Sequence, residues 1–174
     1  PKNVMLSDSV LNAIVSKLSK AKRPAIVLGG RSHSVSRETL ATFAETFKTV
    51  VFTTPGQKGV LNESNPWFAG SFLNGNPELA ILVKADFIPA PNPECFDMLN
   101  RKWPQMQDTE VVTTLPLNEW VIPFPHRHIG SPEAALISIV KCGQGSASEW
   151  TASEILEYRT NLRKTLLGTP GEKM

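Results

Sequence analysis

Short apolar runs that alternate with amphipathic segments constrain the fold of this chain more than any other feature. Residues 25–28 read Ala-Ile-Val-Leu and residues 50–53 read Val-Val-Phe-Thr, without the regular alternation of apolar and polar residues that a half-exposed strand shows. Strands that are apolar on both faces are typical of parallel sheets covered by helices. Between them, residues 36–47 have apolar side chains at helical spacing. The pattern therefore predicts strands joined by helices.

Predicted strands and helices continue to alternate along the rest of the chain. Further strands are predicted at residues 67–70, 86–90, 110–115 and 121–124, and further helices at residues 9–20, 76–84, 94–103, 131–140 and 151–167. The predicted N-caps are Asp8, Ser36, Asn76 and Ser131. Right-handed crossovers then predict an α/β fold of three layers, α/β/α, with a doubly wound, Rossmann-like, six-stranded parallel sheet in the order 3-2-1-4-5-6. The strand residues expected to be buried are Ile26, Val27, Val51, Phe52, Phe87, Ile88, Val111 and Val112.

Composition excludes several classes of protein. The 174 residues suit one domain, and 41% hydrophobic with 20% charged residues is an ordinary globular mixture. The net charge is +2 and no run of Lys and Arg exceeds two, which argues against a nucleic-acid partner. No apolar run approaches the roughly 20 residues of a membrane span. The two cysteines, Cys95 and Cys142, are expected to be buried thiols in a reducing compartment, the cytoplasm.

Four segments resemble, in order, the central domain of thiamine-diphosphate-dependent enzymes of the acetohydroxyacid synthase and pyruvate decarboxylase family. They read AKRPAIVLGG at residues 21–30, VVFTTPGQKGVLNESNPWFAG at 50–70, ADFIPA at 85–90 and SPEAALISIV at 131–140. These resemble the family's first strand with its glycine turn, its second strand with the following turn, its fourth strand, and its last helix. Residues 1–4, PKNV, resemble the linker that leaves the preceding domain.

The resemblance implies that the chain is a part of a longer enzyme. Residues 1–145 would be the central domain, and residues 146–174 a connector helix and tail toward a C-terminal diphosphate-binding domain. In the family, thiamine diphosphate and Mg²⁺ bind between that domain, with its Gly-Asp-Gly sequence, and a pyrimidine-binding domain. This chain has no Gly-Asp-Gly. The implied parent is a lyase or transferase of 2-oxo acids, similar to acetolactate synthase, that forms a homodimer or homotetramer; the chain alone is expected to be inactive, without catalytic residues.

Turns after the predicted strands are the candidate cofactor site. Glycines let a backbone approach a phosphate closely, and helix N-termini favour its charge. The candidate residues are Gly29, Gly30, Arg31, Thr54, Gly56, Gln57, Asn74, Gly75 and Asn76. The resemblance implies FAD here if the parent is like acetohydroxyacid synthase, ADP if it is like oxalyl-CoA decarboxylase, and no ligand if it is like pyruvate decarboxylase.

Two departures from the family pattern count against FAD, and an empty site is expected rather than FAD or ADP because a fold alone does not establish a ligand. Pro91 follows the fourth strand, and Leu115 follows the fifth, where FAD-binding relatives carry an acidic residue. A proline cannot donate a backbone hydrogen bond, and the missing acid removes a partner for a ribose or adenine. A stand-alone FAD- or ADP-binding module and a purely structural domain remain as alternative functions.

Other candidate site residues have weaker patterns. His126 and His128 would lie on one face of a strand, as in some metal sites. No carboxylate or third His is visibly close to them, so an exposed or core histidine pair is expected instead of a metal site. His33 is expected in an exposed loop. Residues 144–148 are polar and contain Gly and Ser, which predicts a hinge.

Overall fold

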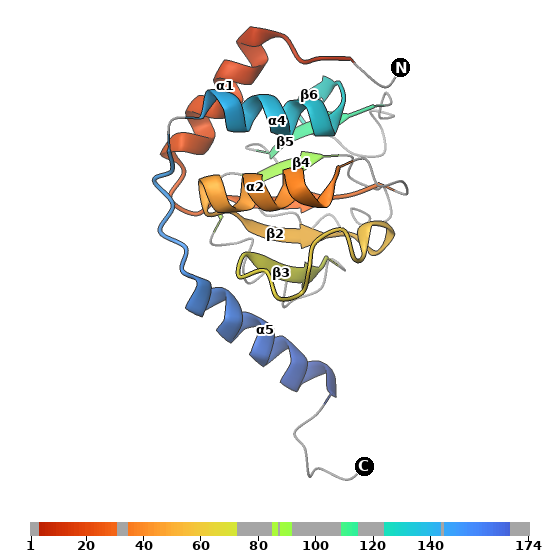
Figure 1. Ribbon diagram of the computed structural model, residues 1–174, viewed down its shortest axis with the longest axis vertical. Coiled ribbons are helices and arrows are strands. Elements are labelled where there is room, and N and C mark those ends of the chain that lie inside the picture. The colour runs from red at the N-terminus through yellow and green to blue at the C-terminus, as the bar shows by residue number, and fades with distance from the viewer. Residues whose placement is uncertain are drawn as a thin grey trace.

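Two parallel sheets of three strands each form the centre of the molecule (Figure 1). The computed structural model describes residues 4–30, 35–72, 85–86, 88–91, 109–114, 124–143 and 145–167. One sheet has the order β1-β2-β3, with the strands Ala25–Leu28, Val50–Thr53 and Phe68–Ser71. The other has the order β4-β5-β6, with the strands Ile88–Pro91, Thr109–Thr113 and His126–Ile129. All four strand pairings are parallel, as predicted.

β1 and β4 lie side by side where the two sheets meet (Figure 1). The backbone N–H of Asp86, just before β4, donates to the carbonyl oxygen of Arg23, just before β1, at 3.1 Å. The order within each sheet agrees with the predicted order. A single six-stranded sheet in the order 3-2-1-4-5-6 remains a prediction, because no strand register joins β1 to β4 among the described residues.

The predicted sixth strand was wrong in position. It was expected at residues 121–124, of which 121–123 lie outside the described residues, and the strand observed is β6, His126–Ile129. Phe124 is instead a buried residue ahead of the strand. β6 is at the edge of its sheet and its side chains are only partly covered, so polar residues can occupy it and the apolar signal is absent.

Four helices accompany the strands in the described part of the chain: α1 (Asp8–Lys20), α2 (Arg37–Phe47), α4 (Pro132–Cys142) and α5 (Ala152–Leu167). Ser36 and Ser131 are N-caps, as predicted, and accept from the N–H groups of Thr39 and Ala134. The predicted cap Asp8 was wrong. Ser7 caps α1, and Asp8 is its first helical residue, where a negative charge is also favourable.

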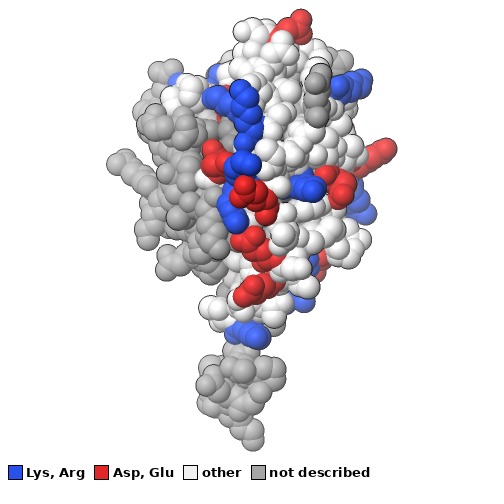
Figure 2. Space-filling model, turned by 90° about the vertical axis from the view of Figure 1, so that its left-hand side faces the viewer, with Lys and Arg blue, Asp and Glu red and all other residues white. Residues whose placement is uncertain are grey.

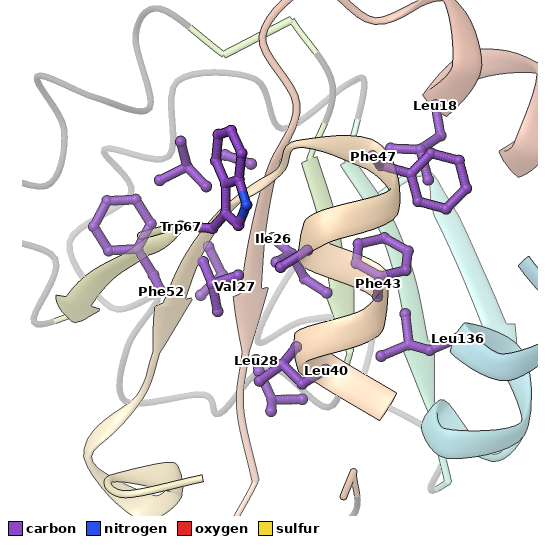
Figure 3. Packing of buried hydrophobic residues seen from close by; sticks show 14 of the residues in the cluster. Leu18, Ile26, Val27, Leu28, Leu40, Phe43, Phe47, Phe52, Trp67 and Leu136 are labelled. Carbon is purple, nitrogen blue, oxygen red and sulfur yellow. The ribbon is translucent and has the colours of Figure 1, made fainter. Parts of the chain in front are cut away.

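Helices α2 and α4 pack side by side on one face of the sheets, and α1 packs against α4 (Figure 1). Figure 3 shows Phe43 and Phe47 along α2, with Ile26 of β1 on one side and Leu136 of α4 on the other. All four side chains are buried, and the two phenylalanine rings are 5.2 Å apart. Burying such side chains supplies most of the driving force for folding, at roughly 1.5–3 kcal/mol for each.

Burial agrees with most of the predictions from sequence. The expected strand residues that the structure describes are buried, namely Ile26, Val27, Val51, Phe52, Val111 and Val112. Phe87 and the side chain of Ile88 lie outside the described residues. The predicted helices at 76–84 and 94–103 lie outside them too, so the predicted layer of helices on the second face of the sheet stays a prediction. Cys142 was predicted to be buried but is exposed, because it lies in the last turn of α4, beyond the last buried residue, Ile139.

Candidate functional site

The carboxyl ends of β1 and β2 form the described part of the candidate site. β1 leads into Gly29 and Gly30, and Gly30 has a φ of +107°, a conformation that glycine adopts without strain. β2 leads into Thr54, whose N–H donates to the carbonyl oxygen of Leu28 at 2.9 Å. A 3₁₀ helix, η1 (Pro55–Gln57), follows. Parallel pairing therefore brings these two predicted turns to one edge of the sheet.

Gln57 joins the two turns. Its side chain is fully buried, and its Nε2 donates to the carbonyl oxygen of Gly30 at 2.8 Å. The hydrogen bond fixes the η1 turn against the β1 turn without any ligand. Gln57 was predicted as a ligand contact, and the geometry gives it a structural contact as well.

Thr54 provides a polar atom that could receive a ligand. Its hydroxyl is fully buried and has no hydrogen-bond partner among the described residues. An unsatisfied buried hydroxyl costs free energy, so a ligand that donated to it or accepted from it would gain affinity. Gly56, by contrast, is exposed on the same turn. The remaining predicted contacts, Arg31, Asn74, Gly75 and Asn76, lie outside the described residues, as do His33 and Cys95.

A second polar cluster lies under α1, and sequence reasoning missed it. Glu110 of β5 has a side chain only 5% exposed, and its Oε1 lies 2.6 Å from Nζ of Lys17 in α1. Its Oε2 lies 2.8 Å from Nε2 of His128 in β6. An ionised carboxylate only accepts hydrogen bonds, so this nitrogen of His128 carries the proton. The expectation that no carboxylate is close to the histidines was therefore wrong, because strand pairing brings together residues 18 positions apart.

The cluster holds Glu110 in its ionised form. Burial pushes the pKa of Glu110 up, but the hydrogen bonds from His128 and Lys17, with the charges of Lys17 and His126, outweigh burial and lower the pKa from 4.5 to about 2. A low pKa makes this carboxylate a weak base near neutral pH. Within the described ranges, no group of three or more His, Cys, Asp or Glu residues could hold a metal ion. The described contacts of the cluster form a structural network that joins α1, β5 and β6.

The segment before α5 is fixed to the core at several points. Ser146 Oγ donates to the carbonyl oxygen of Phe47 at 2.7 Å, and Ser148 Oγ to that of Lys48 at 2.8 Å. The indole N–H of Trp150 donates to the carbonyl oxygen of Pro24 at 2.9 Å, and Trp150 is 3% exposed. The serines of the predicted hinge at 144–148 therefore bind the core backbone, and motion at this segment stays a prediction.

Charges on the surface are mixed. Figure 2 shows acidic and basic side chains close together down one face of the molecule, without a large area of one sign. Lys22 pairs with Glu149 at 3.3 Å and Arg23 with Glu154 at 2.9 Å. The described side chains of this face therefore form no basic patch of the kind that binds nucleic acid. In the part of the chain that the structure describes, no helix has the length and apolar character that crossing a membrane requires.

Comparisons with known proteins agree with the arrangement. A family model described as "Thiamine pyrophosphate enzyme, central domain" matches residues 11–98, just over half of the chain. The X-ray structure of a protein from Mycobacterium smegmatis, assigned as a thiamin diphosphate-dependent enzyme, superimposes with a TM-score of 0.66 at 18% identity, over 82% of this chain. The chain covers only 29% of that protein, and the likeness shows the fold alone. No curated protein sequence matches the chain.

Proposed function

The chain belongs to the family of thiamine pyrophosphate enzyme central domains, and from this premise we propose that it is the central domain of a longer enzyme that decarboxylates or ligates 2-oxo acids. The cofactor of the whole enzyme would be thiamine diphosphate with Mg²⁺, bound between a pyrimidine-binding and a diphosphate-binding domain of the same polypeptide. The whole enzyme would be similar to acetolactate synthase and form a homodimer or homotetramer.

The family match is the observation that carries this proposal. It covers most of α1 and all of β1, α2, β2, β3 and β4. The chain spans less than a third of the thiamin diphosphate-dependent enzyme that it superimposes on. The chain does not fit thiamine diphosphate by itself, because it has no Gly-Asp-Gly sequence and Glu110, its buried carboxylate in the described ranges, is committed to Lys17 and His128. We therefore assign no catalytic step to its residues, and its role would be to hold the two cofactor-binding domains in register.

Carbon dioxide release from 2-oxo acids tests the proposed activity. The full-length gene product should release carbon dioxide from pyruvate or a related 2-oxo acid when thiamine diphosphate and Mg²⁺ are present, and release should fall to the blank without the cofactor. This 174-residue chain alone should give the blank in both cases. Release by the chain alone would contradict the proposal, as would a full-length product inactive on every 2-oxo acid of a broad panel.

The carboxyl edge of the sheet is proposed to be a vestigial nucleotide site. Gly29, Gly30, Thr54, Gly56 and Gln57 would be its described half, and the others would be Arg31, Asn74, Gly75 and Asn76. Supporting an empty site, Gln57 already binds the Gly30 carbonyl. Supporting a ligand, the Thr54 hydroxyl is buried and unpaired among the described residues.

Calorimetric titration with FAD and with ADP decides between these states. We expect weak or no binding of either ligand. Stoichiometric FAD binding with a dissociation constant of about 1 μM or lower, a free energy of about −8 kcal/mol, would contradict an empty site and place the parent near the acetohydroxyacid synthases. Tight ADP binding without FAD would also contradict it and indicate the oxalyl-CoA decarboxylases.

A further inference from the structure

A cavity of about 210 Å³ lies between β3 and the second half of α5, next to the carboxyl ends of β2 and β3. Its walls come from the turn after η1, from the end of β3 and from α5. β3 is the outer strand of its sheet, and α5 packs along it (Figure 1). None of the described residues proposed for the nucleotide site lines this cavity.

Positive charge dominates the lining. Among the described residues, the basic ones in the lining are Lys58, Arg159 and Arg163, and the acidic one is Glu63. Arg159 is held in place, since its Nη2 donates to the backbone carbonyl oxygen of Glu63. The Arg163–Glu63 pair is loose, because the two charged groups are 3.7 Å apart and their side chains are 68% and 72% exposed. Two positive charges therefore remain in excess around the cavity.

The backbone around the cavity is open to a ligand. Gly59 and Gly70 line it with φ values of +86° and +122°, and a Cβ added at either would meet no atom within 4 Å. As an edge strand, β3 directs some backbone N–H groups away from its sheet. Leu61 and Phe68, both buried, give the cavity an apolar base.

We propose that this cavity binds a small molecule that carries a phosphate group. Guanidinium groups match phosphate oxygens with paired hydrogen bonds, and α5 contributes two of them to the lining. Lys58, from the turn after η1, adds a third positive charge. The apolar base suits the uncharged part of the ligand. This site is independent of the proposed function, because neither the family match nor the nucleotide site enters the argument.

Titration of the 174-residue chain with inorganic diphosphate at constant ionic strength tests the proposal. We expect saturable binding, with shifts of the amide NMR signals of Gly59 and Gly70. Arg163→Gln should weaken binding about fivefold to tenfold, as expected for losing one charge-assisted contact. Glu63→Gln should tighten binding, because the competing acid is removed while its backbone carbonyl still holds Arg159.

Lys164→Gln is the matched control. It removes the same charge from the next residue of α5, which is exposed and does not line the cavity. Its affinity should stay within about twofold of the wild type, and circular dichroism should show equal helix content in all variants. Equal weakening by Lys164→Gln and Arg163→Gln would overturn the proposal in favour of diffuse charge attraction. Absence of saturation up to roughly 10 mM diphosphate would also overturn it.

Discussion

At the scale of single residues, Glu110 joins three elements of the fold, β5, α1 and β6. A carboxylate that is only 5% exposed must be compensated, because an isolated buried charge is costly. Lys17 and His128 supply two short contacts from two different elements, α1 and β6. One side chain of β5 therefore connects the first helix of the chain to the last strand of the sheet.

Replacing Glu110 with Gln should destabilise the fold at neutral pH by on the order of 3 kcal/mol, because lowering a pKa from 4.5 to about 2 corresponds to roughly that much stability. Urea unfolding at pH 7 measures this loss. Glu157→Gln, at an exposed position of α5, is the control and should change the free energy of unfolding by less than about 0.5 kcal/mol. Equal stability of the Glu110 variant and the wild type would contradict the role of the cluster.

The contribution of Glu110 should also depend on pH. Its pKa is lower in the folded state than in the unfolded state, so its stabilisation is complete above about 4.5 and is lost as the pH falls toward about 2. The difference in unfolding free energy between wild type and Glu110→Gln should therefore shrink across this window. A difference that stays constant from pH 7 to pH 2.5 would show that Glu110 is not held ionised by its partners.

At the scale of elements, Asp86 joins the starts of β1 and β4. Its Oδ2 accepts from the N–H of Lys22 at 2.7 Å, and its Oδ1 from the N–H of Arg23 at 2.8 Å. Its own N–H donates to the Arg23 carbonyl oxygen. Three hydrogen bonds thus connect the two three-stranded sheets where they meet. They explain why an aspartate is placed at the predicted start of the fourth strand.

Asp86→Asn should cost about 1–2 kcal/mol of stability, because the amide keeps one acceptor where the carboxylate offers two charged ones. Chemical unfolding measures the cost. Amide hydrogen exchange should accelerate mainly in β1 and β4 and leave β3 unchanged. Uniform acceleration over all strands, or none, would show that Asp86 does not hold this junction.

The segment before α5 makes a second prediction at the element scale. Ser146→Ala with Ser148→Ala should release it from Phe47 and Lys48 and make residues 145–151 a site of rapid proteolysis, whereas the wild type should resist. Ser153→Ala, on the exposed first turn of α5, is the control and should resist as the wild type does. Equal cleavage of the wild type and the double variant would show that these hydrogen bonds do not hold the segment, and would support the hinge that the sequence predicts.

At the scale of the whole molecule, local patterns predicted more of the fold than of the site. The first three strands, β4 and β5 are close to their predicted places because buried parallel strands read as apolar runs. β6 was misplaced because an edge strand can be polar. The Glu110 cluster and the contacts of Ser146 and Ser148 were missed because each contact joins residues far apart in the sequence. The sequence held a signal for the Glu110 cluster alone, namely a charged residue within a predicted buried strand.

The most direct test of the central claim is calorimetric titration of thiamine diphosphate with Mg²⁺ into two proteins, the full-length gene product and this chain. The full-length product should bind the cofactor saturably, because its outer domains would supply the two halves of the site. The chain should show no saturable binding, since it belongs to the central-domain family and lacks Gly-Asp-Gly. Saturable binding by the chain alone, or none by a folded full-length product, would contradict the account.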